Sequence, residues 1–114
     1  MAVSNTDDHL RNHGFILTPG GWRLSPLYDV NPIPYGNELS LNVTETDNSI
    51  SVPLAIKTAG YYGISEPEAR QAAGHILHTV GENWVSVARS YKLGKGAIEY
   101  MRPAFSACES VKQI

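Results

Sequence analysis

The second half of the chain carries a helical pattern of hydrophobic and polar positions. Over residues 69–91 the apolar residues recur at helical spacing and form one stripe, which predicts a long helix. Ser65 and Glu68 form a capping box at its start, in which each side chain bonds the backbone of the other residue. Gly74 and Gly81 each weaken this prediction by roughly 1 kcal/mol relative to alanine. The stripe consists of Ala69, Ala72, Ala73, Ile76, Leu77, Val80, Trp84, Val87, Ala88 and Tyr91.

Two shorter helices are predicted on either side of the long one. The first is expected over residues 53–59, with a proline in its first turn and Gly60 or Gly63 ending it. The last is expected from residue 95 to about residue 107, with an interruption at Pro103. The region from 52 to 107 is therefore predicted to be helical.

The first half of the chain has a β pattern instead. Residues 14–17 and 22–24 are short runs of β-forming residues around a Thr-Pro-Gly-Gly turn, which predicts a β-hairpin. Residues 38–43 alternate enough for a further short strand. The expected fold is mainly α with a small β-hairpin, in one unit covering residues 1–114.

Composition narrows the class of protein. The 114 residues are 42% hydrophobic and 18% charged, which is typical of a soluble globular chain. The net charge of −2 gives no basic footprint for direct nucleic-acid binding. Cys108 is the only cysteine, so an internal disulfide is impossible. No apolar run approaches the roughly 20 residues that cross a membrane. A cytoplasmic location is expected.

The polar residues with the most specific arrangement are Asp7, Asn12 and Asp29. Asp7 and Asn12 are five positions apart, and the predicted hairpin separates them from Asp29. Protein kinases order a catalytic aspartate, a metal-binding asparagine and a metal-binding aspartate in this way. The ordered series favours phosphoryl transfer, although each acid taken alone would more often be a loop or cap residue.

Two sequence motifs extend this likeness to a family. They are Asn-Thr-Asp-Asp-His-Leu-Arg-Asn-His-Gly-Phe at residues 5–15 and Trp-Arg-Leu-Ser-Pro-Leu-Tyr-Asp-Val-Asn-Pro at residues 22–32. Together they resemble the catalytic loop, hairpin and metal-binding loop in the C-terminal lobe of HipA-like serine/threonine kinases, the toxins of type II toxin–antitoxin modules. The resemblance implies a truncated, mostly helical kinase lobe.

The resemblance also implies roles for individual residues. Asp7 would be the catalytic base, and His9 would assist it at the transferred phosphate. Asn12 and Asp29 would hold Mg²⁺ against the phosphates of ATP, since oxygen ligands suit this cation. Tyr28, which precedes Asp29, is expected to pack. Asp8 has no clear role in the resemblance.

Other parts of a kinase are not found in this sequence. Gly20 and Gly21 belong to the hairpin turn, and neither a glycine-rich phosphate loop nor the lysine of an N-terminal lobe is found. The chain is therefore expected to be the C-terminal part of a larger kinase, inactive alone and without tight binding of ATP or Mg²⁺. The expected partners are a protein substrate and, from the resemblance, a DNA-binding antitoxin. The alternative is a degenerate lobe that serves as a helical interaction module.

Several residues have plainer interpretations. His9 and His13 could suggest a zinc pair, but they lack a third ligand and the helix that such a site needs. Trp84 and Tyr91 are interpreted as core residues rather than as part of a cofactor site. Asp8 is expected to stabilise the loop.

Overall fold

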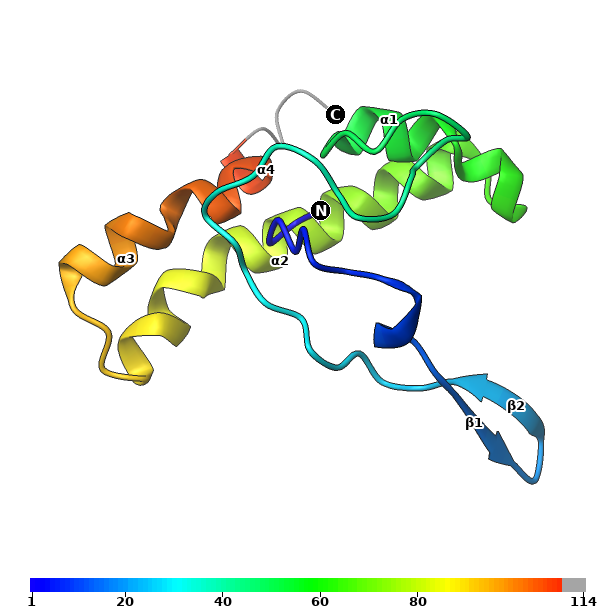
Figure 1. Ribbon diagram of the computed structural model, residues 1–114, viewed down its shortest axis with the longest axis horizontal. Helices are drawn as coiled ribbons and strands as arrows, with labels where there is room; N and C mark the ends of the chain where they lie inside the picture. Colours follow the sequence, from blue (N-terminus) through cyan, green and yellow to red (C-terminus); the bar gives the residue numbers. More distant parts are fainter. Residues whose placement is uncertain (110–114) are drawn as a thin grey trace.

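The computed structural model describes residues 1–109. A long helix lies at its centre, and the other helices lie along it (Figure 1). This helix, α2, comprises Glu66–Ser90. The predicted capping box is confirmed: the Ser65 amide donates to Glu68 Oε2 at 3.1 Å, and the Glu68 amide donates to Ser65 Oγ at 3.4 Å. Lys92, with φ of 64°, follows the end of the helix and turns the chain back.

Shorter helices pack on α2. Contacts to it come from α1 (Val52–Lys57), from the 3₁₀ segment at Ala59–Tyr62 and from α4 (Ser106–Glu109). Between α2 and α4 lie α3 (Lys95–Met101) and the 3₁₀ segment at Arg102–Phe105. The predicted helices are thus present, and the predicted interruption at the proline is this 3₁₀ segment at Arg102–Phe105. No helix within residues 1–109 has both the length and the apolar character needed to cross a membrane.

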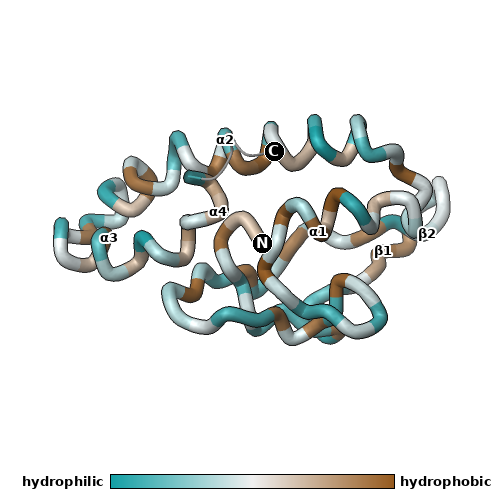
Figure 2. The backbone as a smooth tube through the Cα atoms, turned by 90° about the horizontal axis from the view of Figure 1, so that it is seen from above, coloured by the Kyte–Doolittle hydropathy of each residue, from teal (hydrophilic) through white to brown (hydrophobic). Residues whose placement is uncertain are grey.

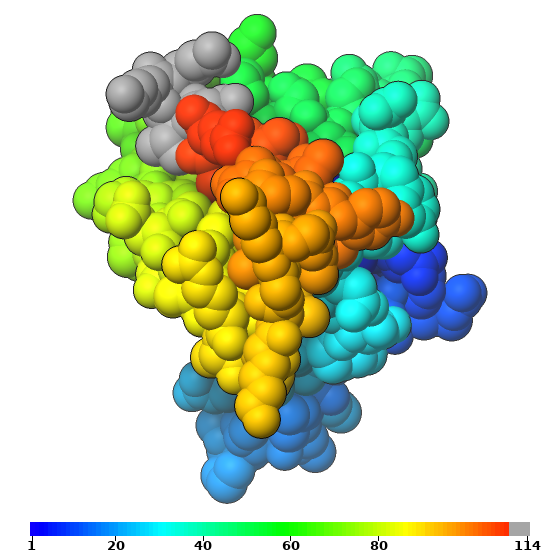
Figure 3. All heavy atoms as spheres, turned by 90° about the vertical axis from the view of Figure 1, so that its left-hand side faces the viewer, coloured from blue at the N-terminus to red at the C-terminus, as the bar shows by residue number. Residues whose placement is uncertain are grey.

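The predicted β-hairpin is also present. Strand β1 (Phe15–Thr18) pairs antiparallel with β2 (Gly21–Leu24), so that Phe15 lies opposite Leu24. Gly21 adopts φ of 114°, a left-handed conformation that other residues rarely adopt, and this explains a glycine at the turn. The hairpin extends beyond the helices (Figures 1 and 3). Its large apolar side chains are therefore exposed.

The short strand predicted at residues 38–43 is wrong. The segment contributes only an isolated bridge between Glu38 and Ser49. Its backbone bonds close a loop instead, with the Val43 amide donating to the Asp47 carbonyl at 2.7 Å. The hairpin extends away from the helices, so neither free edge of β1 or β2 lies beside this segment.

The core is small and lies around α2, where α1, the 3₁₀ segment after it and the C-terminal segments pack together. Trp84 is half-buried and stacks on the buried Phe105, with ring centroids 4.1 Å apart and planes 6° apart, so it packs against the core. Tyr91 is 79% exposed, so its interpretation as a core residue is wrong. Ile76 and Val87 are also exposed, because the segments packed on α2 cover only part of its apolar stripe. Figure 2 shows hydrophobic positions, in brown, recurring along α2. The buried apolar residues are Ile56, Ala59, Leu77, Ile98, Ala104 and Phe105.

Candidate functional site

The centre of the candidate site is a contact between Asn12 and Asp29. Asn12 ends a single 3₁₀ turn at Leu10–Asn12 and is only 7% exposed. Its Nδ2 donates to Asp29 Oδ2 at 3.1 Å, although the two residues are 17 positions apart. The His9 amide donates to Asn12 Oδ1 at 3.2 Å, which fixes the orientation of the carboxamide, because only its oxygen can accept. The two residues predicted as metal ligands therefore lie side by side.

The hairpin and its base bring these residues together. Where the strands end, the Ser25 amide donates to the Gly14 carbonyl at 2.8 Å. Three residues after Ser25, the Tyr28 hydroxyl donates to the Arg11 carbonyl, also at 2.8 Å. The sequence suggested that Tyr28 only packs, but its side chain is 46% exposed and its hydroxyl forms this hydrogen bond. Its hydroxyl ties the segment before Asp29 to the loop that carries Asn12.

Asp29 is held on both of its carboxylate oxygens. Asn12 occupies Oδ2, and Asn31 Nδ2 donates to Oδ1 at 2.9 Å. The backbone of Asp29 has φ of 54°, in the left-handed region where aspartate and asparagine are enriched among non-glycine residues. This conformation and the two amide donors set the direction in which the carboxylate points.

Asp7 differs from Asp29 in being free. It is exposed, and within residues 1–109 it accepts no hydrogen bond and forms no ion pair. Its carboxylate is therefore available to a hydrogen-bond donor from outside the chain. His9, two residues later, is half-buried, and its Nδ1 is buried without a hydrogen-bond partner in the described chain.

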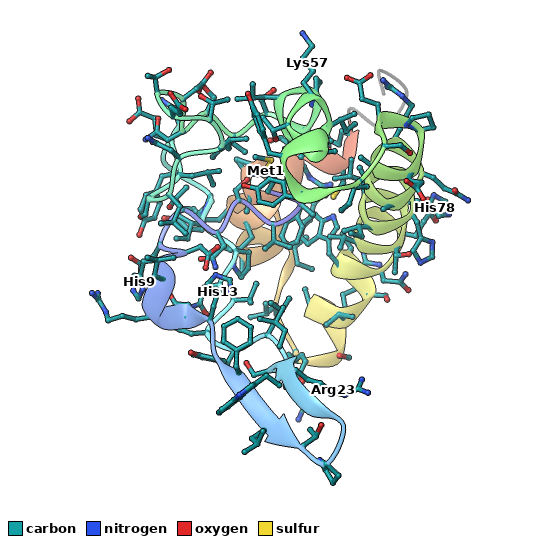
Figure 4. The ribbon with its side chains drawn as sticks, turned by 90° about the vertical axis from the view of Figure 1, so that its right-hand side faces the viewer. Met1, His9, His13, Arg23, Lys57 and His78 are labelled. Carbon is teal, nitrogen blue, oxygen red and sulfur yellow. The ribbon has the colours of Figure 1, made fainter. Side chains whose placement is uncertain are left out.

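Asp8 and His13 tie the two ends of the loop together. His13 Nε2 lies 2.8 Å from Asp8 Oδ1, and the pair encloses the 3₁₀ turn at Leu10–Asn12. This agrees with the stabilising role expected of Asp8. Figure 4 shows His9 and His13 on this loop next to the hairpin, whereas His78 lies on the outer side of α2. In the part of the chain that the structure describes, no three His, Cys, Asp or Glu residues gather as a metal cluster.

Behind the loop lies a mainly apolar cavity of about 630 Å³. The loop contributes its polar wall, which includes Asn5, Asp8, Asn12 and His13. Asn5 is 8% exposed, and its Oδ1 is buried without a partner among the described residues. The apolar wall includes Leu39, Leu41, Ile76, Leu77 and Val80.

Comparison with known proteins identifies the family. The model of the HipA-like C-terminal domain matches residues 1–84. The chain belongs to this family. A search of the curated proteins and a search of the solved structures found no match to this chain.

The match to the HipA-like C-terminal domain covers the whole candidate site. It includes the loop, the hairpin and Asp29, together with much of α2. Sequence reasoning placed Asp7, His9, Asn12 and Asp29 here but missed the contact of Asn31. The only sequence signal for it is an amide side chain two residues after an aspartate, a spacing that is common in turns.

Proposed function

We propose that this HipA-like domain supplies the catalytic carboxylate and the magnesium ligands of a serine/threonine protein kinase. The single observation that carries the proposal is the 3.1 Å contact between Asn12 and Asp29, next to an exposed Asp7. These three residues have the order that protein kinases use. Membership of the HipA-like family supports the same interpretation.

The residues present fit a magnesium ion. Asn12 and Asp29 offer amide and carboxylate oxygens, which are the ligands that Mg²⁺ prefers. The two side chains are in contact, with Asn12 Nδ2 3.1 Å from Asp29 Oδ2, and Asn12 Oδ1 keeps a second lone pair beside the bond that it accepts from the His9 amide. When bound, the cation would neutralise charge on the ATP phosphates.

Asp7 is the proposed base. In the proposed reaction the hydroxyl oxygen of a protein serine or threonine forms a bond to the γ-phosphorus of ATP, and the bond from that phosphorus to the bridging oxygen breaks. ADP leaves, and the hydroxyl proton passes to the Asp7 carboxylate. His9 would contact the transferred phosphate from the same loop.

This chain alone is expected to be inactive. Gly20 and Gly21 lie at the tip of the hairpin, away from the loop, so they cannot cover a nucleotide at the site. Phosphoryl transfer depends on positioning and charge stabilisation, both of which need the nucleotide to be held. The nucleotide-binding part must therefore come from elsewhere in a larger kinase.

The test is phosphate transfer from ATP by the complete reading frame that contains this chain. Asp7→Asn and Asp29→Asn are expected to abolish transfer while circular dichroism and the melting temperature stay close to those of the unsubstituted protein. Glu82→Gln, an exposed position on α2, is the matched control and should retain transfer. Transfer retained by Asp29→Asn would refute the assignment.

A second candidate function is a binding module without chemistry. The mainly apolar cavity and the exposed apolar hairpin favour it, because such surfaces mark interaction sites. A DNA-binding antitoxin is the partner that the family suggests. This alternative predicts no transfer by the complete reading frame, and partner binding that survives Asp7→Asn but is lost on substituting the exposed Trp22 of the hairpin.

A further inference from the structure

Two hydrogen bonds join the segment that carries Asp29 to the loop that carries Asn12. One runs between these two side chains, from Asn12 Nδ2 to Asp29 Oδ2 at 3.1 Å. The other runs between their neighbours, from the Tyr28 hydroxyl to the Arg11 carbonyl at 2.8 Å. In the part of the chain that the structure describes, no further hydrogen bond links residues 26–31 to residues 5–13. Each segment is therefore held at two successive positions.

These two bonds differ in what else their groups would have to do. The bond from Asn12 ends on the carboxylate of Asp29, which the proposed function assigns to a magnesium ion, so the carboxamide and the cation compete for the same oxygen. The bond from Tyr28 joins a phenol to a backbone carbonyl, neither of which is assigned to the cation. The Tyr28 hydroxyl also lies beside the end of the loop, where a methyl group on Gly14 would be 3.8 Å from it. The bond from Tyr28 can therefore persist while Asp29 binds a cation.

We propose that Tyr28 is a positioning residue of the site, which holds Asp29 beside Asn12 whether or not their side chains bond each other. It acts through the Arg11 carbonyl rather than by contact with the cation. Without its hydroxyl, the bond between Asn12 and Asp29 is the only hydrogen bond left between the two segments within residues 1–109, and a cation that takes the Asp29 oxygen removes that bond as well. This proposal rests on the proposed function, because it assumes that Asn12 and Asp29 hold the metal.

The test is Tyr28→Phe, which keeps the ring and removes only the hydroxyl. In the complete reading frame, the Mg²⁺ concentration for half-maximal phosphate transfer should rise by about tenfold, the scale found for groups that orient metal ligands. The rate at saturating Mg²⁺ should change much less, because the cation then holds the two ligands together. The melting temperature should stay close to that of the unsubstituted protein, since the bond is exposed and water can replace the hydroxyl. If Tyr28 only packs, its ring suffices, so an unchanged Mg²⁺ requirement overturns the inference.

Tyr35→Phe is the matched control. Tyr35 is also an exposed loop tyrosine, and within residues 1–109 its hydroxyl forms no hydrogen bond. Its substitution should leave the Mg²⁺ requirement unchanged, and an equal rise in both variants overturns the inference.

A second readout does not depend on phosphate transfer. In ¹H–¹⁵N NMR of the 114-residue chain, the side-chain amide protons of Asn12 should exchange with water faster in Tyr28→Phe than in the unsubstituted chain, because one of the two bonds that keep the segments together is lost. The rate should stay the same in Tyr35→Phe. An Asn12 exchange rate that Tyr28→Phe leaves unchanged overturns the inference.

Asp29→Asn separates this inference from the function on which it rests. Transfer that is lost in Asp29→Asn, together with an unchanged Mg²⁺ requirement in Tyr28→Phe, overturns the inference and leaves the proposed function intact. Transfer that Asp29→Asn retains, or that the unsubstituted protein lacks, overturns both.

Discussion

Replacing Phe105 by alanine should destabilise the protein more than any change in its loops. The ring is 8% exposed and stacks on Trp84 at 4.1 Å, so its removal leaves a cavity between α2 and the C-terminal segments. Truncating a buried phenylalanine costs about 3–5 kcal/mol, of which roughly 0.5–1.5 kcal/mol comes from the aromatic pair. Since small domains are stable by only about 5–15 kcal/mol, this is a large share of the total.

Urea unfolding followed by Trp84 fluorescence measures this loss. A Trp22→Phe background removes the signal of the second tryptophan, which is 70% exposed on the hairpin. Because urea lowers the free energy of unfolding by about 1–3 kcal/mol per M, the midpoint should fall by roughly 1 M or more at an unchanged slope. Phe105→Leu keeps most of the volume and should cost about 1–2 kcal/mol.

The matched control for this prediction is Tyr100→Ala. Tyr100 is 66% exposed on α3, and its substitution should change the free energy of unfolding by no more than about 0.5 kcal/mol. A loss below about 1 kcal/mol for Phe105→Ala, at an unchanged slope, would refute the view that this stack anchors the C-terminal segments.

Two further predictions concern α2. Gly74→Ala should stabilise the protein by about 0.5–1 kcal/mol, since no atom lies within 4 Å of the new methyl group, whereas Gly81→Ala places its methyl 3.2 Å from Cys108 Cβ. Thermal unfolding should therefore rank Gly81→Ala below Gly74→Ala, and an equal gain would contradict the tight contact. Hydrogen bonds from Ser65 lower the pKa of Glu68, so the capping box contributes stability above the usual pKa of glutamate and loses it as the pH falls through the lowered value. Ser65→Ala should raise that pKa in an NMR titration and cost about 1 kcal/mol at neutral pH, and an unchanged pKa would contradict this cause.

The sequence predicted elements well where a local signal forces them. The capping box at Ser65 starts α2, and the glycine at position 21 allows the turn of the hairpin. These signals act within a few residues, so they do not depend on which segments of the chain pack together. The strand expected at residues 38–43 failed because a strand needs a neighbour, and alternation does not show whether one is available.

Burial was harder to predict than helix formation. Periodicity identifies the apolar stripe of α2 but not which part of it another element covers. Trp84 is covered by Phe105, whereas Tyr91 lies beyond the reach of the packed segments. For the site, the resemblance assigned Asn12 and Asp29 to one cation, and the structure brings their side chains into contact. The resemblance could not predict the tie from Tyr28 to the Arg11 carbonyl, because backbone acceptors leave no trace in a sequence.

The site and the core depend on different interactions. Asn12 and Asp29 are positioned by short-range hydrogen bonds at the base of the hairpin, whereas the largest aromatic contact lies between Trp84 and Phe105. Substitutions in the two regions should therefore have separable effects. In the complete reading frame, a loop variant such as Asp29→Asn should abolish phosphate transfer at nearly constant stability, whereas Phe105→Ala should lower stability and, while the protein stays folded, leave transfer unchanged. A Phe105→Ala protein that is folded but no longer transfers phosphate would show that the site is coupled to the core through the cavity wall on α2.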